Sequence, residues 1–458
     1  MRAAWYRRRA VGVVSALVLA VCGPLTASSA AQAQSPAQAQ PLSQASTGTA
    51  ATPAAAKGKH SVVTWGASAD RQGAGPADRS YRLIVRTSVG GTNMRIRLSN
   101  AFGDHPVTFA SAYAGLQKQG AELVPGSNHP LSFGGVASVT VPAGETVLSD
   151  PLPGRLAAQT NLVISLYVTG AQGPTTGHGM AMQTNYATAG NHAAEEGAAN
   201  WTDPMGSWYW LDAVAVETST AVSSVVTLGD SITDGWASTT DENRRWPDYL
   251  SRRLQAASGS TVKGVANEGI SGNKVLADGA GEAALNRLQR DVLSQPGVST
   301  VFLFEGINDI KAHSGVTVDD MIAGYQQIID RAHAAGKCVV GATVMPFKGW
   351  YEYDAASEAV RQGVNDWIRN SGALDAVTDF DKITRNPYDP QLILPFFDGG
   401  DHLHPNDKGM QAMADAVDLG RLTSCRPPQG SPGPAETTLV APPLRAGAPR
   451  YDLVRRGA

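Results

Sequence analysis

Short apolar runs alternate with helical patterns from residue 222 onward, and this alternation constrains the fold more than any other feature of the sequence. The expected strands are 225–228, 262–266, 300–304, 337–344 and 376–380. The expected helices are 246–257, 318–335, 356–370 and 406–419. Strands that alternate with helices form a parallel sheet that is covered on both faces. The pattern therefore predicts an α/β fold with a parallel five-stranded sheet of flavodoxin-like size.

The chain before this region has a different pattern. Between residues 60 and 215, apolar and polar residues alternate over short runs such as 80–87 and 94–99, and Gly, Pro, Asn and Asp separate the runs. A period of two is typical of half-buried strands. We therefore expect an antiparallel β-sandwich of roughly eight short strands before the parallel sheet.

Four aromatic residues gather near the end of the expected sandwich, namely Trp201, Trp208, Tyr209 and Trp210. Such side chains can stack on sugar rings, or they can fill a core or a seam between domains. We favour the core or seam, because buried aromatic side chains are the commoner case.

The composition and the ends of the chain indicate an exported protein. A basic N-terminus precedes an apolar stretch that is too short to span a membrane comfortably. Charged residues make up 17% of the chain, the net charge is −3, and no run of Lys or Arg follows the N-terminus, which argues against a nucleic-acid partner. We expect a secreted monomer without stable membrane insertion. The expected parts are a signal peptide at 1–30, a disordered linker at 31–58, the sandwich at 59–218, the α/β domain at 219–425 and a disordered tail at 426–458.

Two cysteines, Cys338 and Cys425, remain once the signal peptide is removed. Cys338 begins the fourth expected strand, and Cys425 follows a final helix that runs back toward the same face of the sheet. Two cysteines in an exported protein favour a disulfide, and two buried thiols are the alternative.

The first strand of the parallel sheet ends in Gly229, Asp230 and Ser231. Binding crevices in open α/β sheets lie at the carboxyl ends of strands, so Ser231 is a candidate nucleophile. The alternative is that Asp230 and Ser231 only cap the following turn.

A serine nucleophile needs a histidine base and a carboxylate that orients the imidazole. Candidates stand close together before the last helix. Pro405 suits the first turn of that helix and biases His404 away from helical geometry, and Asp401 lies three residues before His404. Asp398 and His402 stand in the same segment, and the four residues together would also suit a metal site.

The loops after the second and third strands offer hydrogen-bond donors for an oxyanion. The Gly272 amide can approach a substrate closely, and the Asn308 side chain is a neutral donor. For each loop taken alone, an ordinary Gly/Asn turn is the better interpretation.

Together, the segments that begin at Gly229, Gly269, Gly306 and Asp401 resemble the four blocks of the SGNH, or GDSL, hydrolase superfamily over about residues 222–425. The resemblance implies Ser231 as nucleophile, and His404 with Asp401 as base and orienting acid in place of His402 and Asp398. It also implies an oxyanion hole made by Ser231, Gly272 and Asn308. A β-rich segment before such a domain is similar to secreted GDSL acylhydrolases, including arylesterases linked to xylan.

We therefore expect a secreted serine esterase that forms an acyl-enzyme and needs neither a metal nor an organic cofactor. The substrate is an ester carried by a small molecule or a polysaccharide, with a short acyl, an aryl or a carbohydrate acetyl group. The loops at 345–353 and 392–397 would line an acyl pocket, stack on a sugar or only pack. The alternatives are a lipase or phospholipase, or a carbohydrate-binding protein with a vestigial hydrolase domain.

Overall fold

The structure, a computed structural model, describes residues 58–170 and 173–423, which belong to one compact unit. We call residues 58–219 the β domain and residues 223–423 the α/β domain. The predicted signal peptide at 1–30, the tail at 426–458 and nearly all of the linker at 31–58 lie outside the described residues. Cys425 also lies outside them, so its pairing with the buried Cys338 stays a prediction.

The β domain contains strands that pair in an antiparallel manner. The strands are β1 (Lys59–Gly66), β2 (Asp70–Ala74), β3 (Arg79–Arg86), β4 (Gly91–Ser99), β5 (Val107–Gln119), β6 (Glu122–Leu123), β7 (His129–Pro130), β8 (Val139–Val141), β9 (Thr146–Leu148), β10 (Leu152–Leu156), β11 (Asn161–Thr169), β12 (Pro174–His178), β13 (Asn185–Ala189), β14 (Asp203–Met205), β15 (Trp208–Tyr209) and β16 (Leu211–Ser219). One sheet has the order β1-β16-β4-β10, and a larger one has the order β14-β13-β3-β11-β5-β6. A third, smaller sheet has the order β15-β12-β2.

The two larger sheets share one hydrophobic core, which gives the domain the predicted sandwich arrangement. Val62, Ile96 and Val214 from the first sheet are buried in the same cluster as Leu83 and Ile164 from the second. The prediction of roughly eight strands was too low, because strands of two or three residues carry no readable alternation. It also missed β5, whose small residues Ala110, Ala112 and Ala114 give a weak apolar signal.

The aromatic cluster near the end of the β domain lies mainly in the core, as the sequence led us to favour. Trp201, Trp208 and Trp210 are all at most 4% exposed. The Trp210 ring meets those of Tyr81 and Phe109 nearly at right angles, with centroids 5.1 and 5.6 Å away. These tryptophans are therefore not available to stack on a sugar.

The α/β domain is built on the predicted parallel sheet, with the order β18-β17-β19-β20-β21. Its elements are β17 (Ser223–Gly229), α1 (Ser231–Asp234), α2 (Trp246–Ala256), β18 (Val262–Gly269), α3 (Ala284–Arg287), a π-helical turn (Leu288–Leu293), β19 (Val298–Phe304), α4 (Ile307–Lys311), α5 (Val318–Ala334), β20 (Cys338–Ala342), α6 (Ala355–Asn370), β21 (Ala376–Thr378), α7 (Phe380–Thr384), β22 (Arg385–Asn386), β23 (Asp389–Ile393), α8 (Asp407–Ala416) and α9 (Leu419–Thr423). This is the strand order of a flavodoxin-like sheet.

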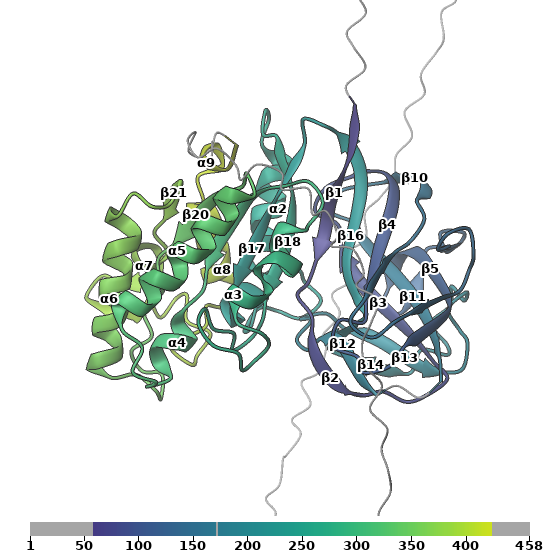
Figure 1. The fold of residues 1–458 in the computed structure, drawn as a ribbon, viewed down its shortest axis with the longest axis horizontal. Coiled ribbons are helices and arrows are strands. Elements are labelled where there is room, and N and C mark those ends of the chain that lie inside the picture. The colour runs from purple at the N-terminus through teal and green to yellow at the C-terminus, as the bar shows by residue number, and fades with distance from the viewer. Residues whose placement is uncertain (1–57, 171–172, 424–458) are drawn as a thin grey trace, which may run out of the picture. The chain divides into compact units, whose positions relative to one another are not determined.

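Helices cover both faces of this sheet. Successive residues of each strand point to opposite sides, so apolar residues next to each other in a strand are buried in different cores. Val226 and Leu228 of β17 pack in one core with α5 and α6, whereas Val225 packs in another with α2 and α8. Figure 1 shows α5 on the near side of the sheet and α8 behind it. Three of the four long helices lie within one residue of their predicted bounds, and α8 ends three residues earlier than predicted. The sequence pattern missed α3, α4 and α7, which are too short to show a helical period.

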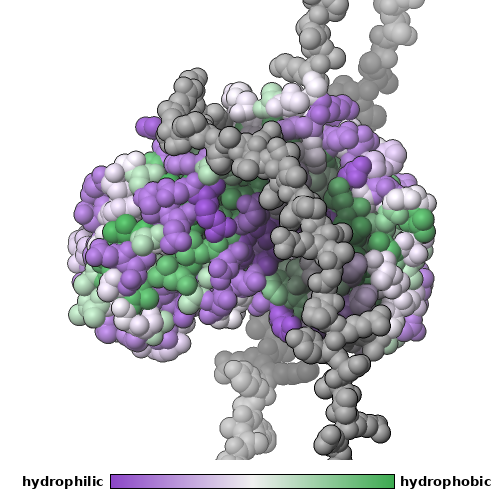
Figure 2. Space-filling model, viewed as in Figure 1, coloured by the Kyte–Doolittle hydropathy of each residue, from purple (hydrophilic) through white to green (hydrophobic). Residues whose placement is uncertain are grey.

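Large hydrophobic side chains also reach the surface. On the face drawn in Figure 2, hydrophobic residues lie in patches between hydrophilic ones. Within residues 58–170 and 173–423, no helix is long and apolar enough to cross a membrane.

Candidate active site

Ser231 lies where β17 ends and α1 begins, at the carboxyl edge of the parallel sheet. The turn needs a glycine at position 229, since a Cβ there would lie 2.6 Å from the Phe304 carbonyl oxygen. The Asp230 carboxylate accepts a hydrogen bond of 2.9 Å from the Ile232 amide and caps the short helix. Burial raises the pKa of Asp230 to about 7. Asp230 therefore stabilises the turn, and the Ser231 hydroxyl is free to contact other groups.

The last helix brings a histidine to this serine. His404 precedes Pro405 and the first turn of α8, and its Nε2 lies 2.8 Å from the Ser231 Oγ. Its other ring nitrogen, Nδ1, lies 2.7 Å from the Asp401 Oδ2. The Nδ1 proton must be donated to this carboxylate, which leaves Nε2 as an acceptor for the serine proton. The structure thus brings Ser231, His404 and Asp401 into the relay that the sequence suggested.

Two further hydrogen bonds fix the Asp401 carboxylate. Its Oδ1 accepts from the amides of Leu403 and His404, at 3.0 and 2.9 Å. Burial acts to raise the pKa of Asp401, but these bonds and the His404 ring outweigh it, so the pKa lies below its usual value. Burial lowers the pKa of His404, although Asp401 acts against this. At neutral pH the pair is therefore a neutral imidazole beside a carboxylate.

The two expected donor loops lie at the same edge of the sheet. Gly272 has a φ of 83°, and an added Cβ would lie 2.9 Å from the Ala280 Cβ, so glycine suits this position. Asn308 stands in the first turn of α4 and is 5% exposed. Its side-chain nitrogen donates to the Asn273 carbonyl at 2.9 Å. An amide nitrogen has two N–H groups, so the second remains for a substrate.

The other acid and histidine of this segment form a separate pair. The His402 Nδ1 lies 2.7 Å from the Asp398 Oδ2, and the His402 side chain is 52% exposed. Asp398 also accepts from the amides of Gly400 and His402. In the described part of the chain, no group of three or more His, Cys, Asp or Glu side chains is placed to hold a metal ion.

Residues 227–412 match the GDSL-like lipase/acylhydrolase family. This part of the chain belongs to that family. The protein is accordingly a carboxylic ester hydrolase. No curated protein matches the sequence.

Solved structures of low sequence identity also align with part of this chain. A lipolytic protein of the G-D-S-L family from Desulfitobacterium hafniense is 18% identical over 42% of this chain and 97% of its own, with a TM-score of 0.34. A carbohydrate acetylesterase from Sinorhizobium meliloti is 17% identical over 42% and 95%, with a TM-score of 0.35. An aryl esterase from M. smegmatis is 16% identical over 44% and 100%, with a TM-score of 0.37.

An arginine that no sequence motif marked connects the first two blocks of the GDSL domain. Arg287 is fully buried, and its Nη2 donates to the Gly229 carbonyl at 3.1 Å. Its Nε donates to the Asn273 side chain at 3.0 Å, and its Nη1 donates to the Glu268 carbonyl at 2.7 Å. A buried arginine looks like a surface arginine in a sequence, because only its tertiary partners distinguish the two.

Aromatic side chains flank the His404 ring. The centroids of Trp236 and Trp350 each lie 5.9 Å from that of the imidazole. Trp236 is 49% exposed, and Tyr351, whose ring centroid lies 4.7 Å from that of Trp350, is 80% exposed. Sequence reasoning had marked Trp350 and Tyr351 but missed Trp236.

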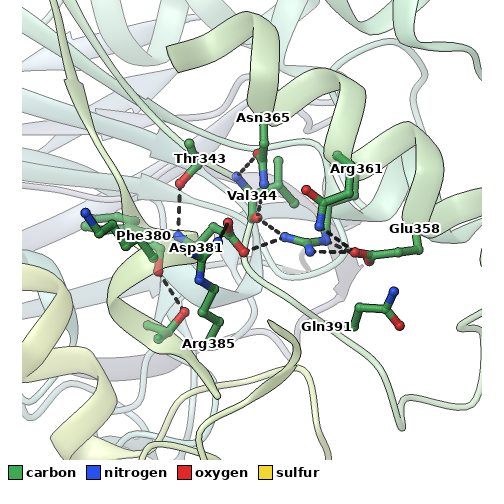
Figure 3. A network of polar contacts seen from close by, with 12 residues as sticks. Thr343, Val344, Glu358, Arg361, Asn365, Phe380, Asp381, Arg385 and Gln391 are labelled. Atoms are coloured by element: carbon green, nitrogen blue, oxygen red, sulfur yellow. Dashed lines mark hydrogen bonds and ion pairs between the residues drawn. The ribbon is translucent and has the colours of Figure 1, made fainter. Parts of the chain in front are cut away.

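A polar network holds the start of the loop that carries Trp350. The loop follows β20, and the Val344 amide donates to the Asn365 side chain at 2.7 Å while the Val344 carbonyl accepts from it at 2.8 Å (Figure 3). The buried Arg361 also donates to the Val344 carbonyl, at 2.9 Å, and to the Asp381 carboxylate, at 2.8 Å. The other expected pocket loop packs in part, since Ile393 is buried in the core on the α8 side of the sheet.

Proposed function

We propose that the protein is a serine esterase that cleaves its substrate through an acyl-enzyme on Ser231. The observation that carries the proposal is the unbroken relay from the Ser231 Oγ through His404 to Asp401, with contacts of 2.8 and 2.7 Å. His404 takes the hydroxyl proton as the oxygen attacks the ester carbonyl, and Asp401 stabilises the imidazolium that forms.

The developing oxyanion accepts hydrogen bonds from the amides of Ser231 and Gly272 and from the Asn308 side chain. These donors are already fixed before the substrate arrives, which is what makes such groups effective in a transition state. His404 then gives its proton to the leaving alcohol, and water repeats the cycle on the acyl-enzyme. The reaction as written uses no cofactor.

The aromatic side chains favour a substrate with a ring in its alcohol part. His404 protonates the leaving alcohol, so groups beside the imidazole face that part of the ester. Trp236 and Tyr351 expose their rings there, and exposed aromatic rings bind sugars and aryl groups. We therefore propose short-chain esters of aryl alcohols or carbohydrates, with acetylated xylan as the polysaccharide to test first.

The test of the catalytic proposal is Ser231→Ala, assayed on p-nitrophenyl acetate. We expect a loss on the order of 10⁴-fold or more in kcat/KM with the fold retained. Ser238→Ala is the matched control, because Ser238 is equally buried and its hydroxyl has no hydrogen-bond partner among the described residues. Substantial turnover by Ser231→Ala would overturn the assignment.

The test of the substrate compares acetylated xylan with p-nitrophenyl esters of rising chain length. We expect activity on the acetylated polysaccharide and a decline beyond short acyl chains. A preference for long acyl chains would instead support the lipase alternative. We also propose export by the predicted signal peptide, and recovery of the precursor inside the producing cell, uncleaved, would contradict it.

A further inference from the structure

Asp234 is a buried carboxylate that the proposed mechanism does not use. It is the last residue of α1, the helix that begins at Ser231, and it is 3% exposed. Its Oδ2 accepts from both the amide and the hydroxyl of Ser271, each at 2.9 Å. Its Oδ1 lies 2.9 Å from the Nε2 of His178. Asp234 therefore connects the nucleophile helix, the Gly272 loop and a residue of the β domain.

The surroundings of His178 require that its ring carry a positive charge. Its Nδ1 lies 2.8 Å from the Ser68 carbonyl oxygen, and its Nε2 lies 3.0 Å from the Met180 carbonyl oxygen and 2.9 Å from the Asp234 carboxylate. Carbonyl oxygens and a carboxylate only accept hydrogen bonds, so both ring nitrogens must donate. Burial acts to lower the pKa of His178, but Asp234 and the two carbonyls raise it overall.

This charge matters because, among the described residues, His178 is the basic side chain that forms an ion pair with Asp234. A carboxylate at 3% exposure is costly to bury unless a positive group pairs with it. Arg245 contacts Asp234 only at the backbone, where its Nε donates to the Asp234 carbonyl at 2.9 Å. The His178 imidazolium therefore pairs with the Asp234 carboxylate and orients it.

Hydrogen bonds, more than packing, hold the Gly272 loop on this side. A pocket of about 190 Å³ lies beside the loop and is lined by Ile270, Ser271, Ala280 and Met180, among others. The loop has room to shift into this space. The bonds from Ser271 to Asp234 on one side of Gly272, and from Asn308 to Asn273 on the other, fix the glycine between them.

We propose that His178 is a positioning residue through which the β domain sets the place of the Gly272 amide in the oxyanion hole. The inference rests on the proposed function, since it takes Gly272 as an oxyanion donor. His178 orients the Asp234 carboxylate, Asp234 holds Ser271, and Ser271 fixes the next residue, Gly272. The β domain thereby becomes part of the catalytic machinery without touching the substrate.

The test is a double-mutant cycle on the full chain with p-nitrophenyl acetate, using His178→Gln, Asp234→Asn and both together. A misplaced Gly272 amide should lower kcat by no more than the complete loss of one oxyanion donor, which is about 10²–10³-fold. We expect His178→Gln to lower kcat about 10- to 100-fold with KM within about twofold of its original value. Because His178 acts through Asp234, the double variant should be no more than about threefold slower than Asp234→Asn.

Gln159→Ala is the matched control. Gln159 also lies in the β domain and donates to Ser251 of α2 at 2.5 Å, but it makes no hydrogen bond to Asp234. A general loss of stability would lower the melting temperature of both His178→Gln and Gln159→Ala. Only His178→Gln should also lower kcat at unchanged KM. If His178→Gln behaves like Gln159→Ala, or if the two losses multiply in the double variant, the inference is overturned.

Two further results keep the tests distinct. If His178→Gln does not fold, Asp234→Asn decides, and an unchanged kcat in that variant overturns the inference. Ser231→Ala is measured alongside. An inactive Ser231→Ala with an unaffected His178→Gln removes only the present inference, whereas an active Ser231→Ala removes the proposed function.

Discussion

Replacing Asn308 tests the oxyanion hole most directly. Of its two side-chain N–H groups, one donates to the Asn273 carbonyl at 2.9 Å, and the other is left for the substrate. The Asn308→Ala variant lacks this second N–H group, so it cannot donate a hydrogen bond to the oxyanion that forms from the ester carbonyl. Loss of one such donor costs about 10²–10³ in kcat, which corresponds to about 2.7–4 kcal/mol.

The Asn308→Ala variant is expected to change kcat and not KM. A hydrogen bond that forms only in the transition state lowers kcat and kcat/KM alike and leaves KM nearly unchanged. Steady-state hydrolysis of p-nitrophenyl acetate measures both constants. A KM that rises at constant kcat, or a kcat within about threefold of the original, would refute the oxyanion role.

Two control variants separate chemistry from folding. Asn308→Asp keeps the side-chain volume but replaces the donor by an acceptor, so it should lose at least as much activity as Asn308→Ala. Asn365→Ala removes another buried asparagine, which bonds the Val344 amide and carbonyl away from the reacting groups. The Val344 carbonyl keeps its bond from Arg361, whereas the Val344 amide is left unpaired, which costs about 1–3 kcal/mol of unfolding free energy. Asn365→Ala should therefore lower the melting temperature far more than the kcat of the folded enzyme.

Two other predictions concern titration and thiols. Catalysis needs neutral His404, and burial lowers the pKa of this imidazole, so activity should persist below the ordinary histidine pKa of about 6.5 and fall as the pH drops through the lowered value. A kcat/KM profile with its acid midpoint at or above pH ~6.5 would contradict this. Cys338 and Cys425 are predicted to form a disulfide, so the denatured, unreduced mature protein should show no reactive thiol. Two reactive thiols in that assay would refute the pairing.

The sequence predicted the parallel sheet and the relay for the same physical reason. Parallel strands end at one edge, so polar residues that directly follow apolar runs must gather there. Ser231 follows β17, Asn308 follows β19, and His404 lies just before α8. Pro405 was expected in the first turn of that helix, but it precedes the N-cap, which is Asn406. These placements depend only on local pattern and on strand order, and both can be read from the chain.

The groups that support the relay could not be predicted in this way. Arg287 and Asp234 resemble ordinary surface charges in the sequence, and only their burial reveals a different role. The His178–Asp234 contact joins residues 56 positions apart in two different domains. Nothing in a local pattern records which carbonyl oxygens surround a histidine, yet those oxygens decide its charge.

The contacts between the domains also argue against regarding the β domain as a detachable appendage. Val63 of β1 is buried in a core of the α/β domain, and its amide donates to the Pro296 carbonyl at 2.8 Å. Gly264 of β18 has no room for a side chain, because a Cβ would lie 2.5 Å from the Val63 carbonyl oxygen. Ser88 both donates to the Val265 carbonyl and accepts from the Val265 amide. Strand β18 leads directly into the Gly272 loop. The β domain therefore supports that loop in two ways, through its contacts with β18 and through the contact of His178 with Asp234. A binding module that merely delivers an enzyme to its substrate would need neither contact.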